Sequence, residues 1–306
     1  MEKIKNTKAK ALVLMSGGLD SILAAKLLLE QGIEVEGICF YSNFFDCVLA
    51  RKAAEQLKIS LREIDIRDEF LQLLKERPKH GYGVGLNPCI DCHALMFKKA
   101  GETMRSENFS FVATGEVLNE RPMSQHKQAL GIVERESGLE GYLLRPLSAK
   151  LLEPTQPEID GLVDREKLMD ISGRSRQKQM DLAKKFVITE YPSPAGGCAL
   201  TQSGFVSRLQ ELIKNKPNFN AEDVELVKIG RHFWIGGVQV VLGRNKEENG
   251  ILLKLKEEKD TIVEPENFVG PTAVIRGWAD NELVEKTKEL IIKFSPKAAN
   301  NAKFKT

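Results

Sequence analysis

The first residues able to do chemistry form the segment Ser16-Gly17-Gly18-Leu19-Asp20-Ser21. It follows a short apolar run, Ala11–Met15, and precedes a stretch of helical periodicity, Ile22–Gln31. A tight Gly-Gly turn between a strand and a helix leaves backbone N–H groups unpaired at the helix N-terminus, and these attract anions. The hydroxyls of Ser16 and Ser21 add donors, and the Asp20 carboxylate suits a magnesium ion held against phosphates. The segment therefore predicts a magnesium–phosphate site, although it lacks the Lys of a Walker sequence.

A second set of reactive residues is formed by three cysteines. Cys89 and Cys92 have the C-x2-C spacing that lets two thiolates reach one metal, and Cys198 lies on another Gly/Pro-rich segment. Three thiolates with an open fourth position predict a catalytic site rather than a structural one. Iron–sulfur ligation, persulfide and disulfide exchange, and a zinc site completed by His93 all fit these residue types.

The elements that must position these residues alternate between strand and helix. Strands are predicted at 11–15, 35–40, 61–66 and 109–114, with helices at 22–31, 48–57 and 70–76. Such alternation is typical of an α/β domain with a parallel sheet. Two Gly/Pro-rich insertions, 78–92 and 191–198, are predicted to be ordered loops that carry the cysteines, and 157–186 is predicted to be helical.

The pattern changes near residue 204, where we place a domain boundary. Short strands are predicted at 226–229, 233–235, 238–242 and 251–255, followed by a helix at 281–294 and a frayed tail from Ser295. We thus expect domains at 1–203 and 204–306, the second of the α+β class.

Composition sets outer limits on function. The chain has 306 residues, a formal net charge of +2 and 29% charged residues, so bulk charge predicts no polyanion or membrane partner. No apolar run reaches the ~18 residues of a membrane span, and we expect a cytoplasmic protein. Five cysteines are too few for a disulfide scaffold. Cys39, at the end of an apolar strand, is predicted to be a buried small side chain, and Cys47 receives no role.

The segment SGGLDS resembles the pyrophosphate loop (PP-loop) of the ATP pyrophosphatase superfamily, whose members adenylylate a substrate oxygen and release pyrophosphate. Thr114-Gly115-Glu116, followed by VLNERPMSQ, looks like the TGE…SQ segment of the tRNA 4-thiouridine synthetases. Asn87-Pro88-Cys89-Ile90-Asp91-Cys92 resembles a loop of the tRNA 2-thiouridylases in which NP precedes a catalytic cysteine, and Gly197-Cys198 lies where those families carry a second one. The resemblance covers roughly residues 10 to 200 and implies the adenine nucleotide alpha-hydrolase-like, Rossmann-like fold.

The resemblance also implies a function, the ATP-dependent thiolation of a tRNA uridine. It implies that ATP and Mg²⁺ bind at Ser16, Gly17, Gly18, Asp20, Ser21, Thr114 and Gly115. It further implies catalytic roles for Asp20, Cys89, Cys92 and Cys198. Relatives with three such cysteines are associated with a [4Fe–4S] cluster, which we favour over zinc. The partners are then tRNA and sulfide or an external sulfur donor. Two alternatives stay open: another adenylating enzyme, of the deazaguanine nitrile synthase or ligase type, and a non-catalytic, zinc-stabilised RNA-binding factor.

The C-terminal part carries a separate resemblance. VVLGRNKEENG, at Val240–Gly250, resembles the RNA-binding domain of the NFACT proteins. Only residues 1–10 precede the first strand in this sequence, so we expect 204–306 to replace the RNA-binding domain that precedes the catalytic domain of 4-thiouridine synthetases. Arg231, Phe233 and Trp234 are candidates for stacking on bases, whereas Trp278 is predicted to be a core aromatic. A basic island at 174–178 either contacts RNA phosphates or is a solvated helix face.

Overall fold

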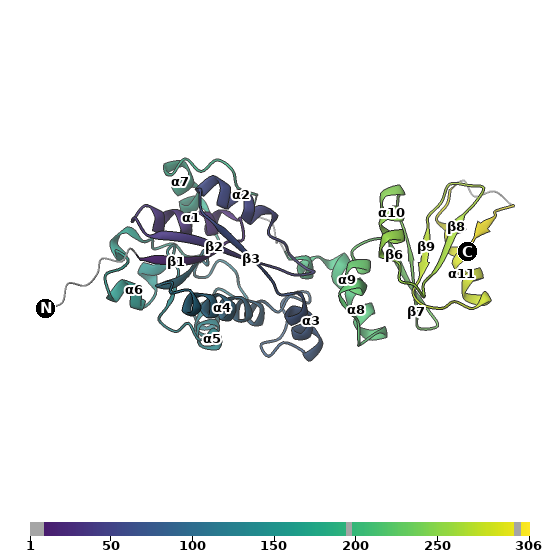
Figure 1. Ribbon diagram of the computed structural model, residues 1–306, viewed down its shortest axis with the longest axis horizontal. Helices are drawn as coiled ribbons and strands as arrows, with labels where there is room; N and C mark the ends of the chain where they lie inside the picture. The colour runs from purple at the N-terminus through teal and green to yellow at the C-terminus, as the bar shows by residue number, and fades with distance from the viewer. Residues whose placement is uncertain (1–8, 194–197, 297–300) are drawn as a thin grey trace. The chain divides into compact units, whose positions relative to one another are not determined.

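The chain folds into two compact units. The computed structural model describes residues 9–193, 198–296 and 301–306. The units divide between Thr201 and Gln202, two residues before the boundary placed from the sequence. Each unit has its own five-stranded sheet (Figure 1).

The first unit is built on a parallel sheet with the strand order β3-β2-β1-β4-β5. Its strands are β1 (Lys10–Leu14), β2 (Glu34–Tyr41), β3 (Leu61–Asp65), β4 (Phe111–Thr114) and β5 (Leu143–Leu144). The α/β class with a parallel sheet, predicted from the alternation of strand and helix, is confirmed. The order reverses direction between β1 and β4, and parallel sheets bind ligands beside such a reversal.

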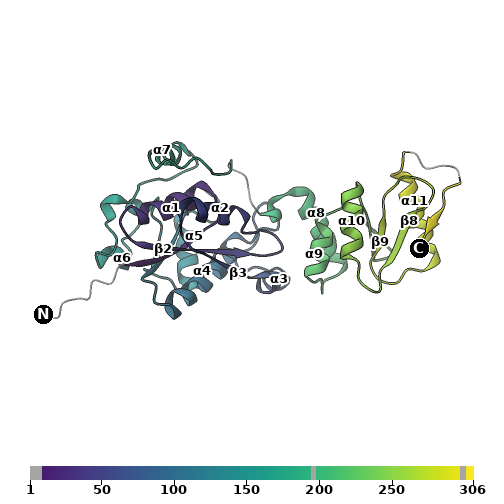
Figure 2. The ribbon, with the colours of Figure 1, turned by 45° about the horizontal axis from the view of Figure 1, so that its top comes forward.

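Helices cover both faces of this sheet. Helices α1 (Leu19–Leu29), α2 (Val48–Leu57) and α7 (Gln177–Lys185) lie on one face, and α4 (Cys89–Ser106) and α5 (Lys127–Ser137) lie on the other (Figures 1 and 2). Because both faces are covered, the middle of the central strand β1 is apolar, and its residues Ala11, Leu12 and Val13 are fully buried. None of the helices in the described ranges is long and apolar enough to cross a membrane.

The connecting segments are less regular than the sequence suggested. The region 157–186, predicted to be helical, contains only α6 (Gln156–Ile159), a 3-10 turn (Arg165–Lys167) and α7. Two further 3-10 turns lie at Ala149–Leu151 and Ala199–Thr201, and α3 occupies Arg67–Glu76. Within the insertion 78–92, helix α4 already begins at Cys89, so the C-x2-C pair lies on a helix rather than in a loop. Residues 194–197 of the second insertion lie outside the described residues.

Cys39 and Cys47 form a disulfide, which corrects the prediction that Cys39 is merely a small buried side chain. Their Cα atoms are 6.0 Å apart, although eight positions separate them in sequence. Cys39 is near the end of β2 and Cys47 is the N-cap of α2, so the bond closes the loop between these two elements. Loop shape, which the sequence pattern does not give, brings the two together.

The second unit has an antiparallel sheet with the order β10-β8-β9-β7-β6. Its strands are β6 (Arg231–Ile235), β7 (Val238–Leu242), β8 (Thr261–Pro265), β9 (Ala273–Ile275) and β10 (Phe304–Lys305), and its helices are α8 (Ser203–Asn215), α9 (Ala221–Val227), α10 (Lys246–Leu255) and α11 (Asn281–Lys293). The α+β class is confirmed. The strands predicted at 226–229 and 251–255 are wrong, because these apolar runs are the last turns of α9 and α10. The tail predicted to fray instead contains β10, which pairs with β8.

The segment that carries the NFACT resemblance forms a turn and a helix cap. The side chain of Asn245 accepts a hydrogen bond from the backbone N–H of Glu248 at 2.9 Å and begins α10. Asn249 Oδ1 accepts from the N–H of Thr272 at 3.1 Å, which ties α10 to the start of β9. A Cβ on Gly243 would stand 2.1 Å from that same Asn249 oxygen, so glycine is required there. This motif therefore has a structural role, because it begins α10 and joins it to β9.

His232 on β6 is a half-buried neutral imidazole. Its Nε2 donates to the Ile229 carbonyl at 2.7 Å, and its Nδ1 accepts from Gln239 Nε2 at 3.1 Å. Burial lowers the pKa of His232 to about 4. A histidine in the unfolded chain becomes protonated below a pKa of about 6.5, whereas His232 in the folded protein stays neutral to a lower pH.

We predict that the second unit loses stability as the pH falls from about 6.5 to about 4, by on the order of 3 kcal/mol. Above about pH 6.5 the imidazole is neutral in both the folded and the unfolded state, so the free energy of unfolding does not depend on it there. Both tryptophans of the chain, Trp234 and Trp278, lie in this unit, so urea unfolding followed by tryptophan fluorescence reports on it. His232→Gln should flatten the profile, whereas His126→Gln in the first unit should leave it as in the wild type. A wild-type profile that is flat between pH 4 and 6.5 would show that His232 is not held neutral.

Candidate active site

The two predicted nucleotide segments meet at the reversal of strand order. SGGLDS follows β1 and Thr114-Gly115-Glu116 follows β4, and these strands are neighbours, with Leu14 paired to Thr114. Their carboxyl ends therefore open on the same crevice, beside the N-terminus of α1. The sequence predicted both segments as nucleotide-binding, and the strand order brings them together.

Two glycines let backbone segments approach the start of α1 more closely than a side chain permits. Gly17 has φ +77°, and a Cβ there would lie 2.2 Å from the carbonyl carbon of Leu49 in α2. A Cβ on Gly115 would lie 2.5 Å from both the Asp20 carbonyl carbon and the Ser21 nitrogen. The glycine loop is thus clamped between α2 and the end of β4 by backbone contacts alone.

The remaining predicted residues surround this clamp. Ser16 is exposed, Gly18 is half-buried, and Ser21 and Thr114 are buried. Ser16 Oγ accepts from the N–H of Gly18 at 3.3 Å, and Ser21 Oγ donates to the Gly18 carbonyl at 2.8 Å. The two hydroxyl oxygens are 3.4 Å apart. Two hydroxyls therefore lie close together beside the N-terminus of α1, a combination that suits a phosphate site.

Asp20 lies half-buried in the first turn of α1. Burial raises its pKa above the ordinary value. The Arg176 guanidinium is the strongest of the groups that oppose this rise, followed by the Gln179 amide. Asp20 Oδ1 is buried without a hydrogen-bond partner, and a carboxylate oxygen in that condition suits a cation or a donor from a ligand.

Cys89 and Cys92 occupy the first turn of α4, a spacing that directs both toward the same side of the helix. Asn87 organises the approach, since its Oδ1 accepts from the N–H of Gly85 at 3.1 Å and its Nδ2 lies 3.1 Å from Cys89 Sγ. The carboxylate of Asp91 caps the preceding turn by accepting from the N–H groups of residues 79 and 80.

Backbone hydrogen bonds bring the segment after Cys198 to the segment before Cys89. The N–H of Leu86 donates to the Leu200 carbonyl at 3.2 Å, and the N–H of Ala199 donates to the Phe44 carbonyl at 3.2 Å. All three cysteines are half-exposed free thiols. Burial raises the pKa of Cys198 to about 11 and that of Cys92 well above its ordinary value.

The three sulfurs influence one another electrostatically. Burial and then the charge of Cys198 and Cys89 raise the pKa of Cys92. The same proximity to Cys89 adds to the burial effect at Cys198. In the described part of the chain, however, no three His, Cys, Asp or Glu side chains are arranged around one point as metal ligands. The sulfurs are neighbours as thiols, without the geometry of a metal centre.

A buried ionic network behind the cysteines escaped the sequence analysis. Glu116 of the TGE segment accepts from Arg145 Nε at 2.9 Å and lies 2.8 Å from His93 Nδ1, and Arg145 also pairs with Glu134. Burial would raise the pKa of Glu116, but Arg145 and then His93 outweigh it and hold that pKa below the usual value. His93, the candidate fourth zinc ligand, is thus engaged by a carboxylate. An arginine set among Leu143, Leu144 and Leu147 was the one sequence signal of this network.

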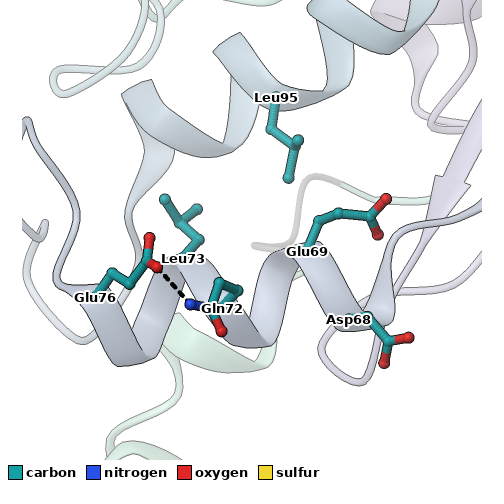
Figure 3. Close-up of a pocket in the computed structure, with 6 residues that line it drawn as sticks. All are labelled: Asp68, Glu69, Gln72, Leu73, Glu76 and Leu95. Atoms are coloured by element: carbon teal, nitrogen blue, oxygen red, sulfur yellow. Dashed lines mark hydrogen bonds between the residues drawn. The ribbon is translucent and has the colours of Figure 1, made fainter.

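A hollow of about 470 Å³ elsewhere in the first unit is unsuited to phosphates. Leu73 of α3 and Leu95 of α4 line it, and the carboxylates of Asp68, Glu69 and Glu76 stand at its rim (Figure 3). Its acidic rim repels polyanions, so we place no nucleotide or tRNA there.

Comparison with known proteins supports the PP-loop interpretation. Residues 9–159 match the family described as the tRNA methyl transferase HUP domain. A tRNA-specific 2-thiouridylase of Geotalea uraniireducens is 37% identical over 138 residues, which are 37% of this chain and 36% of that protein. The chain carries a PP-loop domain similar to that of the tRNA 2-thiouridylases. A second 2-thiouridylase, from Fusobacterium nucleatum subsp. nucleatum, is 25% identical over 83% of this chain and 75% of its own length.

The chain aligns with the first curated relatives over 36% and 31% of their own length, about a third. Residues 230–306 match the NFACT protein RNA binding domain. Among solved structures, a predicted subunit of tRNA methyltransferase from Methanocaldococcus jannaschii gives a TM-score of 0.37 at 16% identity, over 58% of this chain and 76% of the other.

We predict that Gly115→Ala abolishes nucleotide binding and destabilises the PP-loop domain by about 1–3 kcal/mol, since the new methyl group must push the start of α1 away. Gly131→Ala in α5 is the matched control. Its methyl group meets nothing closer than 3.5 Å, so it should stabilise the helix slightly. Urea unfolding and the thermal shift caused by Mg-ATP measure both effects. Normal Mg-ATP binding by Gly115→Ala would contradict the tight approach described here.

Proposed function

We propose that this protein is an ATP-dependent tRNA sulfurtransferase that replaces a uridine carbonyl oxygen with sulfur. The observation that carries the proposal is that one domain contains both a candidate phosphate site and a group of three cysteines. The glycine loop at the end of β1 supplies a phosphate cradle, and the backbone bond between Leu86 and Leu200 draws Cys89, Cys92 and Cys198 into one neighbourhood. The similarity to tRNA 2-thiouridylases favours this chemistry over other uses of a PP-loop.

The residues present fit ATP and magnesium. The N-terminus of α1 offers backbone N–H groups to phosphate, and the buried Asp20 oxygen in its first turn lacks a hydrogen-bond partner. We assign the phosphates to Ser16, Gly17, Gly18 and Ser21, with Thr114 and Gly115 closing the opposite side. Asp20 would hold the magnesium ion, which neutralises phosphate charge when bound.

The proposed first step is adenylylation. A uridine of tRNA leaves its stack, because its carbonyl edge is otherwise unreachable. The carbonyl oxygen attacks the α-phosphorus of ATP, an O–P bond forms, and the bond to the departing pyrophosphate breaks. The helix N-terminus of α1 stabilises the negative charge that develops on the phosphate oxygens. The tRNA substrate is consistent with the cytoplasmic location expected from the sequence.

Sulfur then replaces the activated oxygen. Hydrosulfide from an external donor attacks the adenylylated carbon, AMP leaves with the oxygen, and a proton is lost, so no electrons are exchanged. If the sulfur arrives as a cysteine persulfide, its outer sulfur attacks the carbon and AMP leaves, so that the base is joined to the cysteine through an S–S bond. A second cysteine thiolate then attacks the inner sulfur, which breaks that bond, releases the thiocarbonyl and forms a disulfide that an external thiol reduces. Because the described side chains do not show the geometry of a metal centre, we derive no step through a cluster. The [4Fe–4S] cluster stays a prediction for Cys89, Cys92 and Cys198.

The second unit is proposed to bind the tRNA, as its match to an RNA-binding family suggests. Its most exposed aromatic is Trp278, at 88% exposure, which corrects the prediction that this residue belongs to the core. The backbone beside it is fixed, because the N–H of Gly277 donates to Asp260 at 2.8 Å and Asp280 caps α11. By contrast, Arg231 and Phe233 pack on Phe294, with Arg231 4.8 Å from that ring.

We predict that cells lacking this gene lose one tRNA thionucleoside, measured by mass spectrometry of digested tRNA. The wild-type gene should restore it, whereas Asp20→Asn and Cys198→Ala should reduce it at least about a hundredfold. Asn should be tolerated structurally at position 20, because burial already disfavours the charge there. Asp68→Asn, on an exposed turn of α3, is the matched control and should restore the nucleoside fully.

The same experiment separates the competing functions. An unchanged thionucleoside profile in the deletion strain would reject thiolation and leave another adenylating reaction or a non-catalytic RNA-binding role. Iron and sulfide content of protein prepared without oxygen decides the sulfur route. Iron that is lost with any one of the three cysteines supports the cluster, and iron-free protein that is active with a persulfide donor supports the thiol route.

We predict that Trp278→Ala weakens tRNA binding by roughly tenfold, the loss expected when one base no longer stacks on an aromatic ring. Stacking involves no counterion release, so the factor should be nearly the same at low and high salt. Val269→Ala is the control, since this side chain is 85% exposed and apolar but has no ring. Equal losses in both variants would indicate a general apolar contact instead of base stacking.

A further inference from the structure

Four buried polar atoms beside the PP-loop lack hydrogen-bond partners. They are Asp20 Oδ1 of α1, Arg176 Nε at the N-cap of α7, and both side-chain amide atoms of Gln179 in α7. Gln179 is fully buried. Each such atom costs about 1–3 kcal/mol when left unpaired, so a cluster of them marks a place that a ligand completes.

Helix α7 is held firmly over α1, so these atoms are fixed in place. Ala183 of α7 is buried in the same apolar cluster as Ile22 and Leu23 of α1, and Phe186, which follows α7, lies 5.9 Å from the Lys26 ammonium of α1. Both views of the ribbon show α7 on the outer side of α1 (Figures 1 and 2). The sequence alone did not connect this helix with the PP-loop, because about 150 residues separate them.

The basic island at 174–178 divides into two kinds of side chain. Lys178 points to solvent and pairs with Asp170 at 2.9 Å, and Arg174 is exposed. Arg176 alone is half-buried and lies near enough to Asp20 to influence its pKa. A solvated helix face, or a row of phosphate contacts along RNA, would leave all three outside.

The Gln179 amide approaches the Asp20 carboxylate without completing a hydrogen bond in normal geometry. A buried amide beside a carboxylate can hold one oxygen by donation while the other oxygen remains available to a cation. Around the same point lie Glu120, whose pKa is raised by burial and then by Asp20, and Arg121. The two acids and two arginines balance in charge, so a nucleotide and its metal ion enter without a large net repulsion.

We propose that α7 completes the nucleotide site, with Arg176 binding a phosphate oxygen of Mg-ATP through its buried Nε–H and Gln179 orienting the Asp20 carboxylate toward the magnesium ion. This inference deepens the proposed function and rests on ATP being the ligand of the PP-loop. Arg176 is then a phosphate-binding residue, and Gln179 is a positioning residue that acts through Asp20. A guanidinium suits this task because its donors are fixed in direction and its charge is permanent.

The test measures binding of Mg-ATP and of tRNA to the full chain, by calorimetry, for Arg176→Met and the matched control Arg174→Met. Arg176→Met should weaken Mg-ATP binding at least about tenfold, as expected for loss of one charge-assisted hydrogen bond. Arg174→Met should stay within a factor of about two, and neither should change tRNA binding without nucleotide by more than that. Arg176→Lys keeps the charge but not the Nε–H, so it should also bind Mg-ATP more weakly. This variant replaces Arg176→Met in the test if the Met variant does not fold.

Gln179→Leu provides a separate readout, because a positioning role predicts a specific effect on magnesium. The Mg²⁺ concentration that half-saturates ATP binding should rise about tenfold, while metal-free ATP binding stays unchanged. Wild-type affinity of Arg176→Met and Arg176→Lys for Mg-ATP would overturn the inference, as would an equal loss of tRNA binding in the 174 and 176 variants. A wild-type protein that binds no Mg-ATP would overturn the proposed function as well, whereas binding without thiolation would overturn only that function.

Discussion

The first unit depends on one constraint, the close approach of three backbone segments at the start of α1. Gly17 lies against α2 and Gly115 lies against residues 20–21, at distances that exclude any Cβ. Because β1 and β4 are paired neighbours, this packing fixes where both nucleotide segments end. It also sets the position of Asp20 relative to Arg176 and Gln179 of α7.

The buried polar and charged side chains of this unit form two clusters, which differ in how many of their atoms lack a hydrogen-bond partner. Glu116, Arg145 and His93 satisfy one another, although one nitrogen of Arg145 stays unpaired, and this network braces the end of β4 against α4. Asp20 and its neighbours on α7 are not satisfied among themselves. The first cluster leaves one side-chain atom unpaired and the second leaves four, so the second is the better candidate for the place where a ligand enters. This difference in hydrogen bonding distinguishes the structural network around Glu116 from the candidate binding site around Asp20.

Much of this architecture could be predicted from local patterns, and the failures have physical causes. Continuous apolar runs bounded by turn residues gave the central strands of the first sheet, because a strand buried on both faces needs such a run. In the second unit, apolar runs of four or five residues at 226–229 and 251–255 looked the same, yet they are helix ends. Periodicity does not separate a short buried strand from a short buried helical segment. The Cys39–Cys47 bond, the exposure of Trp278 and the inward turn of Arg176 depend on tertiary approach, which no local pattern encodes.

The cysteine site shows how burial and proximity together control reactivity. A helix N-terminus favours thiolates by about 0.3–1 kcal/mol, and α4 presents Cys89 and Cys92 in its first turn. Desolvation is the larger effect, since the pKa values of Cys92 and Cys198 are nevertheless raised. Cys89 and Cys198 add to the raised pKa of Cys92, and Cys89 adds to that of Cys198, so the ionisation of Cys92 and Cys198 depends on their neighbours. Cys92 and Cys198 therefore hold their protons at neutral pH. In the thiolation proposed above, a thiol that resolves a persulfide must first lose its proton, so the raised pKa values of these two cysteines would limit that step at neutral pH.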